Sequence, residues 1–155
     1  MNKMNYQEIL EKLKEFYPNG VEDFAYEEQS YDFENYPEAL EAQKVRKEFR
    51  KLHLIDNKWD NVENPKIYSE LPDEYEVIKK LSRKKAGLNW VEVDKYGGEG
   101  KGSTWYSIKY FIDYDIYIKV DGYYQSYNGT EFYDGWDSCS QVFPKQKTIT
   151  VYEQL

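Results

Sequence analysis

The spacing of apolar residues changes once along this chain, at Gly87. Before Gly87 they recur every three or four positions, which is typical of helices with one buried face. After Gly87 they alternate with polar residues, which is typical of strands. Helices followed by antiparallel strands predict an α+β fold. The chain has 155 residues and no linker-like tract, so we expect a single domain over 1–155, mainly helical over 1–87 and an antiparallel sheet over 88–155.

Three helices are predicted in the first half. Asn5 and Glu8 have the spacing of a capping box, and the helix that they begin ends at Pro18-Asn19-Gly20. A second helix begins near Pro37, because proline suits the first helical turn. A third runs over 72–85, and Gly87 fits the left-handed residue that ends it. The apolar residues expected on the buried faces of the second and third helices are Ala42, Val45, Phe49, Leu52, Tyr75, Ile78 and Leu81. Residues 20–35 and 55–69 are expected to be irregular connections.

A meander of about four strands is predicted in the second half. The strands are expected over 90–93, 104–112, 115–124 and 147–152, with the clearest hairpin between the middle two and a turn at Asn128-Gly129. Alternation places two sets of side chains each on one face of this hairpin: Tyr106, Ile108, Tyr110 and Ile112 on its first strand, and Ile116, Ile118 and Val120 on its second.

Composition indicates a folded acidic protein. The net charge is −8, and the chain contains 17 Tyr, 7 Phe and 4 Trp. Disordered acidic chains have few aromatic residues, so this chain is expected to fold. Its single cysteine, Cys139, and the acids of its first helix fit a reducing cytoplasm and argue against a targeting peptide. No apolar run approaches the roughly 20 residues that a membrane helix needs, so no membrane partner is expected.

The negative charge is concentrated between Glu15 and Gln43. This acidic segment, residues 15–43, has no Lys or Arg, and large aromatic rings alternate with its acids: Glu15, Glu22, Asp23, Glu27, Glu28, Asp32, Glu34, Glu38 and Glu41. One interpretation is a solvated loop that keeps the protein soluble. The other is a polyanionic surface that imitates phosphates and occupies the groove of a basic partner. The basic clusters 44–51 and 79–85 could instead neutralise the segment internally.

Motifs for catalysis or cofactor binding are not found. The glycine-rich loop 97–102 departs from phosphate-binding patterns and is followed by a strand, so we interpret it as a hairpin connection. Cys139 and His53 could form a nucleophile and base, but no protease signature surrounds them. The aspartates after residue 112 do not have EF-hand spacing. We therefore expect no catalytic residues, no metal and no cofactor.

Tyrosines gather between residues 122 and 136, among three glycines. Tyrosine offers a large amphipathic contact area, so this loop either packs over the sheet by its own rings or binds a ligand. The candidate residues for a small-ligand or nucleotide site are Tyr123, Tyr124, Tyr127, Tyr133 and Trp136.

Residues 116–155, IYIKVDGYYQSYNGTEFYDGWDSCSQVFPKQKTITVYEQL, resemble the C-terminal part of small acidic proteins found in phage and prophage genomes. The resemblance implies a non-enzymatic protein that counters a host defence, as anti-CRISPR proteins do, in the bacterial cytoplasm. Together with the acidic segment, it predicts a host partner with a basic surface, such as a nuclease or a CRISPR effector, and the negative net charge argues against direct contact with nucleic acid. The residues expected to contact that partner are Glu22, Asp23, Tyr26, Glu27, Glu28, Tyr31, Asp32, Phe33 and Glu34. We further expect residues 104–152 to be the stable scaffold and residues 18–36 a labile surface.

Overall fold

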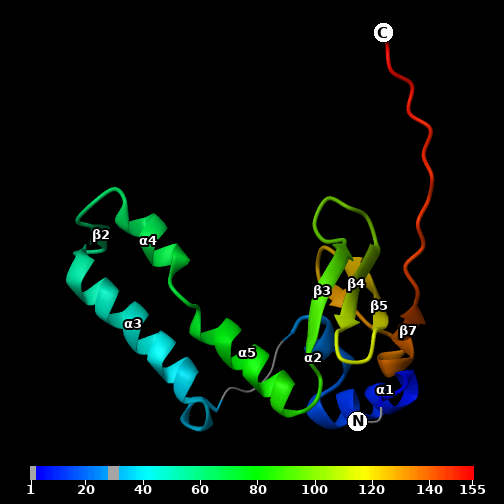
Figure 1. Cartoon of the computed structure of the whole chain (residues 1–155), viewed down its shortest axis with the longest axis horizontal. Coiled ribbons are helices and arrows are strands. Elements are labelled where there is room, and N and C mark those ends of the chain that lie inside the picture. Colours follow the sequence, from blue (N-terminus) through cyan, green and yellow to red (C-terminus); the bar gives the residue numbers. More distant parts are fainter. Residues whose placement is uncertain (1–2, 28–31) are drawn as a thin grey trace.

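The computed structural model describes residues 3–27 and 32–155 and has the predicted α+β architecture. Helices dominate the N-terminal half, and an antiparallel five-stranded sheet follows in the C-terminal half. Figure 1 shows a body, in which the first two helices lie beside the sheet, and an elongated arm of helices that projects from it.

The first helix of the body, α1 (Tyr6–Phe16), begins with the predicted capping box. The Glu8 amide donates to Asn5 Oδ1 at 2.9 Å, and the Asn5 amide donates to Glu8 Oε1 at 3.3 Å. A five-residue helix, α2 (Val21–Ala25), follows where the sequence predicts an irregular connection. That prediction is wrong because a helix of little more than one turn is too short to display a period.

The arm contains α3 (Pro37–His53), the two-stranded hairpin β1 (Leu54–Ile55) and β2 (Lys58–Trp59), α4 (Asn64–Glu70) and α5 (Glu74–Lys85). A short 3-10 helix, η1 (Phe33–Asn35), precedes α3. The predicted helices at Pro37 and before Gly87 are confirmed, and Gly87 has the left-handed φ of +74°. Residues 55–69 are not a loop as predicted, because they contain β2, α4 and the end of β1.

Ala39 and Ala42 of α3 are buried, as is Ile78 of α5. The prediction that Val45, Leu52 and Tyr75 are buried is wrong, since Val45 is 36%, Leu52 70% and Tyr75 46% exposed. The buried line of α3 is therefore rotated from the predicted stripe.

Five strands form the sheet of the body: β3 (Trp90–Tyr96), β4 (Thr104–Phe111), β5 (Ile116–Gln125), β6 (Gly129–Glu131) and β7 (Cys139–Val142). A 3-10 helix, η2 (Gly135–Ser138), precedes β7. The predicted central hairpin is confirmed as β4–β5, with Ser107 opposite Val120. Strand β3 pairs with β4, while β6 and β7 pair with successive parts of the other edge of β5. The loop 97–102 joins β3 to β4, as interpreted from the sequence.

The two faces of the sheet differ in burial. Ser107, Lys109 and Phe111 of β4 are buried beneath α1 and α2, as are Ile118 and Val120 of β5. Tyr106, Ile108 and Tyr110 share one face of β4, as predicted. This face is the half-exposed outer face of the sheet and not the face that packs on the helices.

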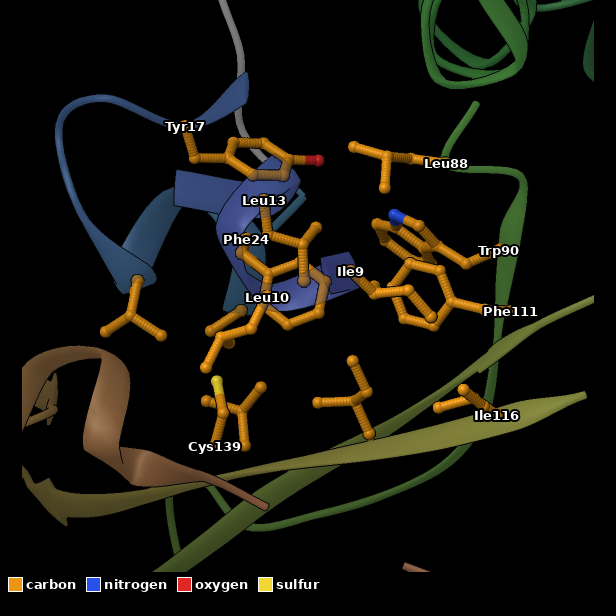
Figure 2. Close-up of a cluster of buried hydrophobic side chains, with 14 of the residues drawn as sticks. Ile9, Leu10, Leu13, Tyr17, Phe24, Leu88, Trp90, Phe111, Ile116 and Cys139 are labelled. Atoms are coloured by element: carbon orange, nitrogen blue, oxygen red, sulfur yellow. The ribbon is translucent and has the colours of Figure 1, made fainter. Parts of the chain in front are cut away.

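The hydrophobic core lies between α1, α2 and the sheet. Figure 2 shows Phe24 of α2 among side chains from α1 and from the strands. The ring centroid of Phe24 lies 5.7 Å from that of Trp90, 6.3 Å from Phe111 and 6.0 Å from Trp136. The centre of the acidic segment is thus also part of the core.

The final strand predicted over 147–152 does not form. Residues 143–155 run away from the body as an extended chain, without a partner strand among residues 3–27 and 32–155 (Figure 1). The last strand is instead β7, whose four residues the sequence analysis did not identify. Propensity for extended backbone is local, whereas a strand also requires an adjacent edge with free hydrogen-bonding groups.

Candidate functional site

The acidic segment surrounds the junction of the body and the arm. Glu22 and Asp23 lie on α2, while Asp32 and Glu34 lie at η1 before the arm. Glu22, Asp32 and Glu34 are exposed, and Asp23 is half-buried. Two more predicted contact residues, Glu28 and Tyr31, lie outside the described residues.

A cleft of about 610 Å³ opens between these elements. Its lining includes the carboxylates of Glu15, Asp23 and Asp32, with Lys85 as the cation. Phe16, Tyr17, Pro18, Tyr36 and Ile78 supply apolar walls. We call this the acidic cleft. Three carboxylates against one ammonium give it the sign that attracts a cationic side chain.

Two aromatic residues of the acidic segment pack against other parts of the protein. The Tyr26 ring lies 5.6 Å from Trp105 and 6.1 Å from Phe132, which fixes it to the body. The Phe33 ring meets Tyr75 of α5 edge-to-face at 5.7 Å. Phe33 therefore holds the backbone next to Asp32 and Glu34, which remain exposed. Tyr26 lines a separate cleft beside β3 and not the acidic cleft.

Glu27 differs from the other acids because it has a buried cationic partner. Its Oε2 lies 3.6 Å from Nη2 of Arg83, whose side chain is only 7% exposed. The Arg83 guanidinium also lies over the Trp90 ring at 3.6 Å. Glu27 takes a left-handed φ of +60°, which a non-glycine residue rarely adopts. The structure therefore places Glu27 in an ion pair of the fold.

Replacing Glu27 by Gln should lower the free energy of unfolding by about 1–3 kcal/mol, because it removes the anion beside a buried guanidinium. Replacing the exposed Glu22 by Gln should change it by less than about 0.5 kcal/mol. Chemical denaturation of both variants measures the difference. Equal stabilities would show that the Glu27–Arg83 pair contributes nothing to the fold.

A second buried cation, Lys109, was missed by the sequence analysis. Its Nζ donates to Ser107 Oγ at 2.8 Å and to the Ala25 carbonyl at 3.3 Å, and lies 3.6 Å from Glu92 Oε2. Ser107 Oγ in turn donates to Glu92 Oε2 at 2.8 Å. Burial lowers the pKa of Lys109, and the charges of Glu92 and Glu27 partly oppose that shift. The signal in the sequence was the alternation that places Ser107 and Lys109 on the same face as Phe111.

A lysine of lowered pKa beside a serine hydroxyl is an arrangement that can generate a nucleophile. Here Ser107 and Lys109 are both fully buried, so no substrate atom can contact the hydroxyl. The Lys109 bond to the Ala25 carbonyl instead ties the end of α2 to β4. We therefore assign these groups to the positioning of α2 and the acidic segment.

The candidate tyrosines of the C-terminal loop do not gather around one cavity. The rings of Tyr123 and Tyr133 lie 6.1 Å apart, whereas Tyr127 is 97% exposed at a turn. Tyr124 lies opposite Thr130 in the β5–β6 ladder. Trp136 packs on the core against Phe24, 6.0 Å between centroids. The structure brings together only Tyr123 and Tyr133 from this set.

The outer face of the sheet carries other tyrosines. Tyr96 stacks on Tyr106 at 6.0 Å, and Tyr110 stacks on Tyr117 at 4.4 Å. The Lys119 ammonium lies over the Tyr106 ring at 4.8 Å. Because these rings use their faces on one another and on Lys119, they are less suited to stacking on bases or sugars.

Cys139 and His53 lie in different parts of the molecule. Burial raises the pKa of the Cys139 thiol to about 12, so the thiol stays protonated near neutral pH. His53 ends α3 on the arm, where its Nδ1 lies 3.2 Å from Asp60 Oδ2. Within the described residues, no three His, Cys, Asp or Glu side chains are grouped so that they could hold a metal ion.

No protein-family model matches this chain, and comparisons with curated proteins and with solved structures found no significant similarity. Within residues 3–27 and 32–155, no helix has both the length and the apolar character needed to span a bilayer.

Proposed function

We propose that this protein acts by binding a basic protein partner through the acidic cleft and the exposed carboxylates beside it, and not by catalysis. The observation that carries the proposal is the lining of the cleft by Glu15, Asp23 and Asp32. A lysine or arginine of the partner entering the cleft would meet carboxylates from α1, α2 and η1 at once.

Two further features support this surface. Tyr26 and Phe33 pack on the body and the arm, so the loss of side-chain freedom at these rings occurs on folding and not on binding. Glu22 and Glu34 are exposed next to the cleft and would steer a cationic partner toward it.

The partner class follows from the resemblance of residues 116–155 to small acidic phage proteins. We propose that the partner is a bacterial host protein with a basic groove, such as a nuclease or a CRISPR effector, and that this protein blocks it in the host cytoplasm. The acidic surface would then compete for the groove with nucleic acid and would not contact nucleic acid itself.

The test is affinity capture from a bacterial lysate, with the wild-type chain compared with an Asp23→Asn, Asp32→Asn double variant. Loss of two exposed ion pairs should weaken the affinity for the captured partner about twofold to thirtyfold, at roughly 0.2–1 kcal/mol per pair. The wild-type affinity should also fall steadily as salt is raised.

The matched control is a Glu63→Gln, Glu70→Gln double variant, which removes the same charge from exposed positions on the arm. It should bind as the wild type does. If the Asp23, Asp32 variant captures the same partner with unchanged affinity, or if the affinity does not depend on salt, the acidic cleft is not the contact surface.

A further inference from the structure

The C-terminal segment has the chemistry of a strand but lacks a partner. Within the described part of the chain, no hydrogen bond joins residues 143–155 to another segment. Residues 147–152, KTITVY, combine β-branched and aromatic side chains, which favour strands. Ile149 is 78% exposed and Val151 is 73% exposed, and alternation places both on one side of an extended chain. We call residues 147–152 the tail strand.

The sheet has an edge that could accept such a strand. Strand β3 pairs with β4 on one side, and its other edge has no partner strand in the described chain. Its seven residues offer about 23 Å of edge, enough for the six residues of the tail strand. Val91 and Val93 on it are 42% and 50% exposed. An unpaired edge of this length is a template for pairing with another chain.

Two clefts follow β3. One, of about 490 Å³, lies between α5 and the start of β3, and its lining includes Leu81, Trp90 and Val91. The other, of about 440 Å³, reaches the end of β3, with Tyr26, Tyr96 and Trp105 in its lining. Glu27 and Glu92 line both clefts, so together they form a groove along the strand, which we call the β3 groove.

The walls of the β3 groove fit the side chains of the tail strand. Leu81 and Val91 offer apolar surface on one side of Glu92, and Tyr26 and Trp105 offer aromatic surface on the other. Ile149 and Val151 would lie about 7 Å apart on one side of the added strand. The ladder of β3 shifts register between Glu92 and Asp94, so the added strand would pair with three residues on each side of the shift.

The tail strand is poorly placed to reach its own β3. The tail leaves from β7, and β4 and β5 lie between β7 and β3. A strand added outside β3 lies four strand spacings from β7, roughly 19 Å, whereas the four residues 143–146 span at most about 14 Å when fully extended. The connection is therefore too short for the tail strand to pair along β3 of its own chain.

We propose that the tail strand of one copy pairs with the β3 edge of a second copy and occupies its β3 groove. When both copies exchange tails, each supplies one strand and one edge, and the assembly closes as a symmetric dimer. The main-chain hydrogen bonds of the added strand supply affinity, and Ile149 and Val151 in the groove supply specificity.

Sedimentation of the full chain over a concentration series tests the exchange. We expect the wild type to be a dimer and an Ile149→Asp variant to be a monomer. Val62→Asp is the matched control, since Val62 is an exposed apolar residue on the arm, 95% accessible, and this variant should remain dimeric. Residues 147–152 are all exposed, so loss of dimer in the tail variant would not reflect unfolding.

A second experiment locates the acceptor. A fluorescent peptide of residues 145–153 should bind the monomeric Ile149→Asp chain, and the same peptide with Val151→Pro should bind at least about tenfold more weakly, because proline removes a ladder donor. Hydrogen exchange should show peptide-induced protection of residues 90–96. A Leu81→Lys variant, which places a charge in the β3 groove, should prevent dimerisation.

Three results would each overturn the exchange. One is a wild-type chain that stays monomeric and a peptide that does not bind. Another is a dimer that survives both Ile149→Asp and Leu81→Lys. The third is peptide-induced protection confined to segments other than β3. None of these results bears on the acidic cleft, so this proposal and the proposed function can fail separately.

Discussion

Replacing Phe24 by alanine should lower the free energy of unfolding by about 3–5 kcal/mol, which is the usual cost of truncating a buried Phe. Phe24 is fully buried and contacts the ring of Tyr17, directly after α1, and rings from β3, β4 and η2. No single neighbour can move to fill the space, because each belongs to a different element. Urea denaturation of the wild type and the variant measures the loss.

The control for this prediction is Tyr127→Ala, which removes a ring that is 97% exposed. It should change the unfolding free energy by less than about 0.5 kcal/mol. Ile118→Ala, in the centre of the sheet, should cost about 2–5 kcal/mol. If Phe24→Ala cost no more than Tyr127→Ala, the acidic segment would not be part of the core.

Replacing Glu92 by Gln should lower the unfolding free energy by about 2–4 kcal/mol. The variant leaves the buried Lys109 ammonium without its nearest anion, at 3.6 Å, and breaking a buried pair typically costs about 3–5 kcal/mol. The expected value is lower because the Glu92 side chain is 29% exposed. Adding Lys109→Met should recover most of the loss, since the double variant no longer buries an ammonium without its carboxylate at this position.

The matched control for Glu92 is Glu99→Gln in the exposed β3–β4 loop, which should not change stability measurably.

The pH dependence of the unfolding free energy gives an independent measurement. Because the folded pKa of Lys109 is lowered from 10.5, the unfolded state binds more protons between the two pKa values. Wild-type stability should therefore rise with pH across that window relative to Lys109→Met. Two results would contradict the ion-pair interpretation. One is a difference in unfolding free energy between the wild type and Lys109→Met that does not vary with pH. The other is a double variant that is no more stable than Glu92→Gln.

Elements in which apolar residues recur regularly over many positions, or that begin or end with a clear capping residue, were predicted correctly from the sequence. The capping box at Asn5, the proline start of α3 and the glycine stop after α5 are all confirmed. So is the hairpin β4–β5. In each case the signal is local: side chains bond to the backbone a few residues away, or apolar residues alternate over a long strand. The short elements α2, α4 and β7 carry no such signal and were missed.

The candidate site shows the same division. The sequence located the acidic segment, since charge is read directly from residue types, and the structure places Asp23 and Asp32 on one cleft. The sequence did not show that Glu27, unlike the acids around it, forms an ion pair of the fold. That distinction depends on Arg83, which is 56 positions away in the chain and reaches Glu27 only because α5 returns to the body.

The sequence by itself determined the fold class, the main helices, the central hairpin and the sign of the charged surface, because these follow from local spacing and composition. Only the tertiary structure decided which face of β4 is buried, why Lys109 lies inside, and that residues 147–152 have no strand to pair with in the part of the chain that the structure describes. Alternation defines two faces of a strand without saying which one a helix will cover. Strand propensity, likewise, does not supply the neighbouring edge that a strand requires.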